Sequence, residues 1–503
     1  MSTVATEPGS SQSHTEFVRA LTLTDATMLV AGIMIGSGIF IVSADMSRLV
    51  GSPFWLLLAW VITGIITLLG ALSYGELAAM FPRAGGQYVF LREAWGPLMG
   101  FLYGWTLFVV IQTGTIAAVA VAFGDFLGVL WPAVGPARYG WFPHFDFTSQ
   151  GSLIQAGLSP ERLVALVSIW VLTWINLRGV RTGKTVQTTL TMIKIAALAL
   201  LIILGLTIGR NASAILANFH AGNFFAPHVD MTSAFVLAFG AALVGSLFSS
   251  DSWNNVTFAA AEVQNPKRNI PLALALGTGM VTLLYVLANV AYLAVLPLHG
   301  TSGAASLLGR GIQFATQDRV GTAAAEVILG ASGGIIMAIL ILISTFGCNN
   351  GLILSAPRVY WAMARDRLFF KKIGTLNARE VPAVALVVQG VWASVLTLTG
   401  TYSQLLDFVI FAGLLFYAST TLGLFILRRK RPDAERPYRA FGYPVVPALY
   451  ILSAATIAVL LLLSGKTRLQ AISGLVLVLI GVPVYYIWQR AGGNPDAAST
   501  GAA

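Results

Sequence analysis

Residues 26–42 read ATMLVAGIMIGSGIFIV, an apolar run with Gly36, Ser37 and Gly38 near its middle. A membrane-spanning helix takes about 20 apolar residues, so this run and its flanks are long enough to cross a bilayer. Each glycine inside a helix costs about 1 kcal/mol relative to alanine, and the triplet therefore favours a break. A break exposes backbone N–H and C=O groups, which lipid tolerates only where they line a cavity or bind something. The alternative is an unbroken helix whose small residues form a packing face.

The composition of the whole chain is typical of a polytopic membrane protein. Its 503 residues are 56% hydrophobic and 10% charged, and the mean hydropathy is +0.79. Apolar runs of sufficient length predict an all-α protein with about twelve spans. The spans are expected at residues 23–46, 53–80, 97–127, 163–177, 186–208, 232–262, 270–296, 333–364, 381–398, 405–427, 445–463 and 469–488.

The net charge of +10 indicates an orientation in the membrane and no nucleic-acid partner. Basic residues gather in loops on one side, including the cluster Arg428, Arg429, Lys430, Arg431, Arg436 and Arg439. Because loops rich in Lys and Arg stay in the cytoplasm, we expect both termini there, in a plasma (inner) membrane protein. Residues 1–20 lack the basic start of a signal peptide and are expected to form a disordered tail, and residues 490–503 a second cytoplasmic tail.

One basic residue lies inside a predicted span. Lys194 stands between Ile193 and Ile195 in the fifth span. A lone ammonium at the centre of a membrane costs roughly 2.5–3.5 kcal/mol, so Lys194 is expected to face the bundle interior and to have partners there. We favour a functional role over the alternative, a structural lysine that backbone carbonyls satisfy.

A second interruption lies in the sixth predicted span, where residues 248–255 read FSSDSWNN. Ser, Asp and Asn compete for backbone hydrogen bonds and favour caps over helix interiors. One half-helix is therefore expected to end near Phe248 and another to begin near Trp253. We interpret Asp251 as a cap of the second half-helix, where a carboxylate meets the positive end of the helix dipole. The alternative is a carboxylate that faces a cationic group of a substrate.

The two breaks occupy corresponding positions in two halves of the chain, residues 21–208 and 232–428. Paired breaks of this kind indicate the binding site of a secondary transporter. Broken helix ends offer N–H groups to an anion and C=O groups to a cation, and an α-amino acid carries both groups at short range. The sequence contains no Walker A loop and no histidine pair at metal-ligand spacing, so we expect no enzyme, no metal and no cofactor.

Several motifs resemble the amino acid–polyamine–organocation (APC) superfamily, and in particular its L-type amino-acid transporter branch. They are GIMIGSGIF at 32–40, ALSYGEL at 71–77, FPRAGGQY at 81–88, EVQNPKRNIP at 262–271, STFGCNNG at 344–351 and the dipeptide Arg436-Pro437. The resemblance covers about residues 21–488. It implies a LeuT-like fold, with five-plus-five inverted repeats in residues 21–430 and a linker with two more helices in residues 431–489.

The resemblance also implies roles at matching positions. Residues implied at the substrate are Met34, Ser37, Gly38, Ile39, Phe248, Ser249, Ser250 and Asp251, and residues implied at the helix breaks are Gly36 and Ser252. The amides of Ser37, Gly38 and Ile39 would hold the substrate carboxylate. The carbonyls of Met34, Phe248 and Asp251 would hold its amino group, and Phe248 would close over the substrate.

Lys194 matches a lysine that takes the place of a sodium ion in similar sodium-independent members. It would bridge the first helix to the eighth near Ser344. The chain departs from the family pattern at Ser250 and Ser252, where an aromatic residue and glycines are common. It departs again at Cys348, where branch members often have serine.

These observations predict a secondary active transporter of L-α-amino acids that works by alternating access. The branch suggests sodium-independent exchange, and proton-coupled uptake is the second possibility. Neutral substrates are favoured, and a cationic amino-acid or polyamine permease is the alternative, supported by Asp251. A non-transporting sensor is a minor alternative. Besides the substrate and the bilayer we expect no disulfide-linked ancillary subunit, because residues 131–161 contain no cysteine.

Overall fold

The structure is a computed structural model that describes residues 17–135, 157–225, 232–399 and 402–490. The predicted tails, 1–20 and 490–503, lie almost entirely outside these residues. The described part is nearly all helical, and 11 of its helical segments are long and apolar enough to cross a membrane by length and composition. A twelfth apolar helix, α17 (Ala383–Thr399), has 17 residues.

The described spans follow the predicted ones closely. They are α1 (Leu23–Met34) with α2 (Gly38–Val50), α3 (Pro53–Met80), α5 (Pro97–Thr106) with the π-helical η1 (Leu107–Ile111) and α6 (Gln112–Leu130), α7 (Pro160–Leu177), α8 (Val180–Leu206), α11 (Ser233–Ser249) with the 3-10 helix η3 (Trp253–Thr257), α12 (Pro266–Val295), α15 (Ala331–Ser355) with α16 (Pro357–Arg365), α17, α18 (Tyr402–Lys430), α19 (Val445–Leu463) and α20 (Arg468–Arg490). The first and sixth spans are broken, as the sequence predicts.

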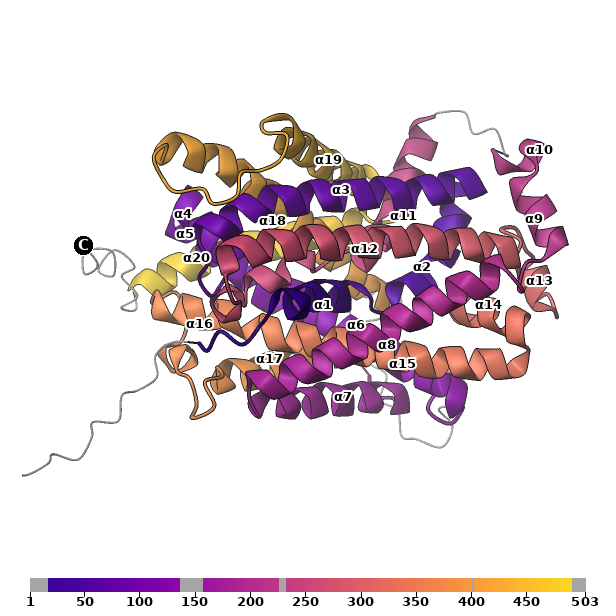
Figure 1. The fold of residues 1–503 in the computed structure, drawn as a ribbon, viewed down its shortest axis with the longest axis horizontal. Helices are drawn as coiled ribbons and strands as arrows, with labels where there is room; N and C mark the ends of the chain where they lie inside the picture. The colour runs from indigo at the N-terminus through magenta and orange to yellow at the C-terminus, as the bar shows by residue number, and fades with distance from the viewer. Residues whose placement is uncertain (1–16, 136–156, 226–231, 400–401, 491–503) are drawn as a thin grey trace, which may run out of the picture.

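The long helices lie roughly along the longest axis of the molecule (Figure 1). The described chain begins and ends near α4 (Gln87–Trp95) and α16, and we call this the terminal end. The opposite end carries the short helices α9 (Ala212–Phe219), α10 (Ala221–Phe224) and α13 (Leu307–Arg310). A bilayer would therefore lie across the long axis, between these two ends.

Burial separates the central spans from the peripheral ones. In α1–α2, 83% of the most apolar stretch is buried inside the protein, whereas the corresponding share for α20 is 22%. Large apolar side chains on the peripheral helices are exposed, among them Leu200 and Ile203 on α8, Leu452 on α19 and Ile487 on α20. Apolar side chains gain nothing by leaving a lipid environment, so these faces suit contact with acyl chains. The corresponding share for the other broken span, α11 with η3, is 61%, so both broken spans are mostly buried inside the protein.

The helices differ from the prediction in detail. The eighth span, expected over 333–364, is one candidate span over Ala331–Arg365, and its helical hydrogen bonding is interrupted at Ala356 because Pro357 lacks the N–H that would continue α15. The second half of the sixth span begins at Trp253, as expected, but it consists of two short 3-10 helices, η3 and η4 (Ala260–Glu262). The loops also contain α4, α9, α10, α13 and α14 (Val320–Leu329), which hydropathy cannot predict because they are too short to span a membrane.

A buried ion pair ties the terminal end together. Nε of Arg358 on α16 donates to Oε1 of Glu262 at 2.8 Å, and both side chains are at most 2% exposed. The backbone of Glu262 accepts from the Leu21 N–H at 2.9 Å, and Gln264 N–H donates to the Leu21 carbonyl at 2.8 Å. The segment before α1 is thereby held against the segment after the second break.

Candidate functional site

The first break separates α1 from α2. α1 ends at Met34, and Ile35 follows in an extended conformation, with φ −76° and ψ 93°. α2 begins at Gly38, so the amides of Gly38 and Ile39 lie in its first turn. The first four N–H groups of any α-helix lack an intrahelical partner, which makes this turn suitable for an anion.

The second break separates α11 from η3. α11 ends at Ser249, and Ser252 adopts the left-handed conformation, with φ 62° and ψ 12°, just before Trp253. A residue other than glycine is uncommon there, and such backbone strain tends to occur at functional sites. Phe248, expected to close over the substrate, is buried in the last turn of α11.

The two breaks lie against each other. The hydroxyl of Tyr285 on α12 lies 2.8 Å from the Met34 carbonyl oxygen and 3.0 Å from that of Ser249. A Cβ atom added to Gly38 would lie only 2.2 Å from Ser249 Oγ. The structure therefore brings Met34, Gly38 and Ser249 together. Tyr285 was not predicted, because nothing in the local sequence distinguishes it from other aromatic residues of the spans.

Lys194 lies beside the first break and is fully buried. Its Nζ donates to the carbonyl oxygens of Gly32 at 2.6 Å, Ile35 at 2.7 Å and Ser344 at 3.0 Å. An ammonium has three protons, and these contacts use all of them. The hydroxyl of Ser344 donates to the carbonyls of Ile35 and Gly36, at 3.2 and 3.0 Å. A fixed positive charge thus sits at the end of α1, where the helix dipole is negative.

Cys348 also touches the first break. Its thiol is buried, and Sγ lies 2.9 Å from the Ile33 carbonyl oxygen on α1. A Cβ atom on Gly36 would lie 3.1 Å from this sulfur. The thiol therefore packs against the last turn of α1 and against the break itself.

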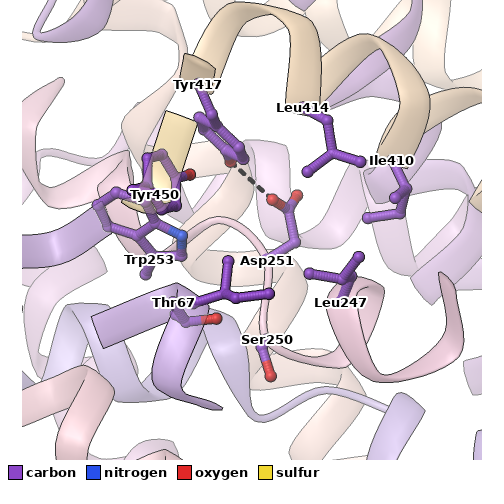
Figure 2. Close-up of a pocket in the computed structure, with 10 residues that line it drawn as sticks. Thr67, Leu247, Ser250, Asp251, Trp253, Ile410, Leu414, Tyr417 and Tyr450 are labelled. Atoms are coloured by element: carbon purple, nitrogen blue, oxygen red, sulfur yellow. Dashed lines mark hydrogen bonds between the residues drawn. The ribbon is translucent and has the colours of Figure 1, made fainter. Parts of the chain in front are cut away.

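Asp251 does not cap the second half-helix, which corrects the interpretation made from the sequence. Because Ser252 takes the left-handed conformation, Ser252 occupies the position before η3, and it makes no side-chain capping bond. The Asp251 carboxylate instead accepts from Tyr417 Oη at 2.6 Å (Figure 2). It also accepts from Ser252 Oγ at 3.1 Å. Tyr417 lies on α18, so this contact joins the second break to the tenth span.

Two small cavities flank Tyr417. One, of about 20 Å³, includes Ser250 and Asp251 in its lining (Figure 2). The other, of about 10 Å³, includes Ser252 and lies towards η1 and α6. A water molecule needs roughly 10–15 Å³, so each cavity has room for little more than one. An amino acid can enter only if the helices around the breaks move apart.

Neutral amide side chains line the second cavity. Asn254 Nδ2 donates to Gln87 Oε1 at 2.6 Å, and Asn255 Nδ2 lies 3.3 Å from Gln112 Oε1. Sequence reasoning assigned these residues no role. Gln112 carried a usable signal, because a buried amide within an apolar span requires a partner.

The geometry defines a class of protein: a helical membrane protein whose two discontinuous spans meet at a polar centre, the arrangement used by secondary transporters. A family model described as "Amino acid permease" matches residues 21–483, and the chain belongs to this family. It is a transporter of the APC superfamily with a LeuT-like fold, and not an enzyme.

Similar proteins with curated names share most of the chain. The large neutral amino acids transporter small subunit 2 of Homo sapiens is 30% identical over 491 residues, which are 96% of this chain and 83% of that protein. The serine/threonine exchanger SteT of Bacillus subtilis is 29% identical over 479 residues, 94% of this chain and 98% of that protein. The b(0,+)-type amino acid transporter 1 of Mus musculus is 27% identical over 479 residues, 94% of this chain and 88% of that protein.

Proposed function

We propose that this permease exchanges α-amino acids across the plasma (inner) membrane without sodium. The main support is the contact of Lys194 Nζ with three backbone carbonyls at 2.6–3.0 Å. An ammonium in this position supplies the monovalent positive charge that a bound cation would otherwise bring to the first break. Exchange is further supported by SteT, whose name describes an exchanger.

The two breaks supply complementary groups for an α-amino acid. The amides of Ser37, Gly38 and Ile39 would receive the carboxylate, and the carbonyls of Met34, Phe248 and Asp251 the amino group. The Met34 carbonyl already accepts from Tyr285, but a carbonyl oxygen has two lone pairs, so a second hydrogen bond can form there. In this proposal the halves 21–208 and 232–428 rotate relative to each other, and this motion opens the site between the breaks to one side of the membrane at a time.

The proposed orientation places the terminal end in the cytoplasm, because the basic cluster at Arg428–Arg431 lies there. Both termini would then be cytoplasmic. The absence of cysteine from residues 131–161 supports a transporter that works without a disulfide-linked subunit. Purification of the chain alone in active form would test this last point.

Substrate analogues test the proposed binding mode. In liposomes containing the purified protein, L-leucine is expected to compete with uptake of a labelled amino-acid mixture. L-leucinol lacks the carboxylate and isocaproate lacks the amino group, so each is expected to compete at least about tenfold more weakly, since a hydrogen bond to a charged group contributes roughly 1.5–3 kcal/mol. Equal competition by either analogue would contradict binding of both groups at the breaks.

Gly38→Ala is expected to lower exchange about tenfold. The added Cβ would lie 2.2 Å from Ser249 Oγ and 3.1 Å from Ser249 Cα, so the two breaks must move apart. Overpacking of this kind costs roughly 1–3 kcal/mol. Gly279→Ala is the matched control, because no heavy atom lies within 4 Å of its added Cβ. Similar exchange by the two variants would show that the close approach of the breaks does not matter.

A further inference from the structure

Three arginines meet at the corner between α7 and α8. The two helices are separated only by Arg178 and Gly179, and Gly179 has φ 120°, a conformation that glycine adopts readily. Arg178 therefore lies directly before this tight corner, and Arg181 lies in the first turn of α8. A Cβ atom added to Gly179 would lie 3.9 Å from Cβ of Arg379, so the segment before α17 packs against the corner.

The guanidinium groups of these arginines have no acidic partner in the part of the chain that the structure describes. Arg178, Arg181 and Arg379 are exposed, and none of them forms an ion pair with a described residue. Glu380, which follows Arg379 in the chain, is only partly exposed and takes part in an interaction of its own. The corner therefore carries an excess of positive charge.

The first turn of α8 adds hydrogen-bond donors to this charge. No side chain caps the helix, which begins at Val180. The first N–H groups of an α-helix lack intrahelical partners, and the helix dipole places partial positive charge beside them. Backbone N–H groups and guanidinium groups both bind phosphate oxygens, so the corner suits a phosphate group.

Trp174 fixes the depth of the corner in the membrane. The guanidinium carbon of Arg178 lies 3.6 Å from the centroid of the Trp174 ring, a distance at which the ring attracts the cation. Trp174 is 53% exposed and lies in the last turn of the candidate span Pro160–Leu177. Tryptophan is enriched where the hydrocarbon of a bilayer meets the headgroups. Arg178 is therefore expected to lie at the depth of lipid phosphates.

Two apolar helix faces continue from the corner into the membrane. α7 and α17 lie side by side (Figure 1), and a Cβ atom added to Gly390 on α17 would lie 3.7 Å from the Trp170 ring on α7. The exposed apolar side chains of the two faces include Val167, Val171, Val387 and Val391. Acyl chains can cover these faces, whereas a soluble anion leaves them bare.

We propose that Arg178, Arg181, Arg379 and the first turn of α8 bind the headgroup phosphate of an anionic phospholipid, whose acyl chains lie along α7 and α17. Basic pockets between membrane-spanning helices bind anionic headgroups by this chemistry. A zwitterionic lipid fits less well, because its headgroup brings a cation that the arginines repel. The site is separate from the two helix breaks, and lipid binding there does not depend on the proposed exchange.

A comparison of two lipids that differ in headgroup charge tests the site. The full chain, purified in detergent, is titrated with palmitoyl-oleoyl phosphatidylglycerol or with the phosphatidylcholine that has the same acyl chains, and native mass spectrometry measures the bound lipid. Phosphatidylglycerol is expected to bind at least about tenfold more tightly. Arg178→Gln, Arg181→Gln and Arg379→Gln combined are expected to weaken its binding at least about tenfold and that of phosphatidylcholine by no more than about twofold.

The matched control combines Arg83→Gln, Arg268→Gln and Arg429→Gln, which remove the same charge from three exposed arginines that also form no ion pair with a described residue. This control is expected to bind phosphatidylglycerol within about twofold of wild type. If the corner variant is not monodisperse, Arg379→Gln alone replaces it, with an expected loss of roughly fivefold.

Three results would overturn the site. The first is equal binding of the two lipids by wild type, and the second is an equal loss of phosphatidylglycerol binding in the corner variant and in its control. The third is displacement of bound phosphatidylglycerol by an equal concentration of glycerol phosphate, because it would show that the corner binds a soluble anion and needs no acyl chains. We expect glycerol phosphate to leave the lipid bound.

Discussion

Lys194→Ala is expected to lower sodium-free exchange by about 100-fold while the protein still folds. The substitution removes a charge and leaves the carbonyls of Gly32, Ile35 and Ser344 without the ammonium that joins them. Hydrogen bonds to charged groups contribute roughly 1.5–3 kcal/mol each, and about 1.4 kcal/mol corresponds to a factor of ten. Loss of one or two of the three hydrogen bonds of Lys194 from the transport-competent state is therefore enough to lower exchange by about 100-fold.

The measurement compares initial rates of exchange in liposomes. Lys372→Ala serves as the control, because Lys372 is an exposed lysine in the short 3-10 helix η6 (Lys371–Gly374). The elution profile in size-exclusion chromatography shows whether each variant is folded. Partial recovery of Lys194→Ala on addition of sodium, with no sodium effect on wild type, would support an ammonium in the place of a cation. Exchange by Lys194→Ala at the wild-type rate would contradict the role proposed for this residue.

Glu262→Gln is expected to destabilise the protein by about 3–5 kcal/mol. Glu262 accepts from Arg358 Nε at 2.8 Å and from Nη2 at 3.3 Å, and both side chains are inaccessible to solvent. Removing one partner of a buried pair leaves the other charge uncompensated, which is the costly change. The melting temperature in detergent is therefore expected to fall by roughly 3–5 °C.

An exposed ion pair provides the control for this effect. Lys267 and Glu435 form a contact of 2.8 Å, and their side chains are 50% and 73% exposed. Exposed pairs contribute about 0–1 kcal/mol, so Glu435→Gln is expected to leave the melting temperature almost unchanged. Equal shifts for Glu262→Gln and Glu435→Gln would contradict the view that the buried pair holds the terminal end together.

Local sequence signals predicted the spans, the first helix break and the burial of Lys194. Hydropathy located the spans, because the length of an apolar run fixes whether it can cross a bilayer. The first break followed from Gly36 and Gly38, which weaken a helix wherever they occur. The buried position of Lys194 followed from the cost of an ammonium in lipid, and the structure shows the required partners.

The contacts between residues on distant spans could not be predicted from the sequence. Asp251 was interpreted by a capping rule that assumes an α-helix on its C-terminal side, whereas the chain forms a 3-10 turn after Ser252. Its partner, Tyr417, is 166 residues away in the chain, and Tyr285 joins the two breaks from a third span. Contacts between distant spans depend on how helices cross, and hydrophobic periodicity carries no information on that.

The central claim is sodium-free exchange, and trans-stimulated uptake tests it most directly. Purified protein is placed in liposomes that are either preloaded with mixed amino acids or left empty, and uptake of labelled amino acids is followed at matched pH without sodium. We predict uptake into loaded vesicles and almost none into empty ones. Uptake that requires sodium, or that proceeds equally well into empty vesicles, would contradict the claim.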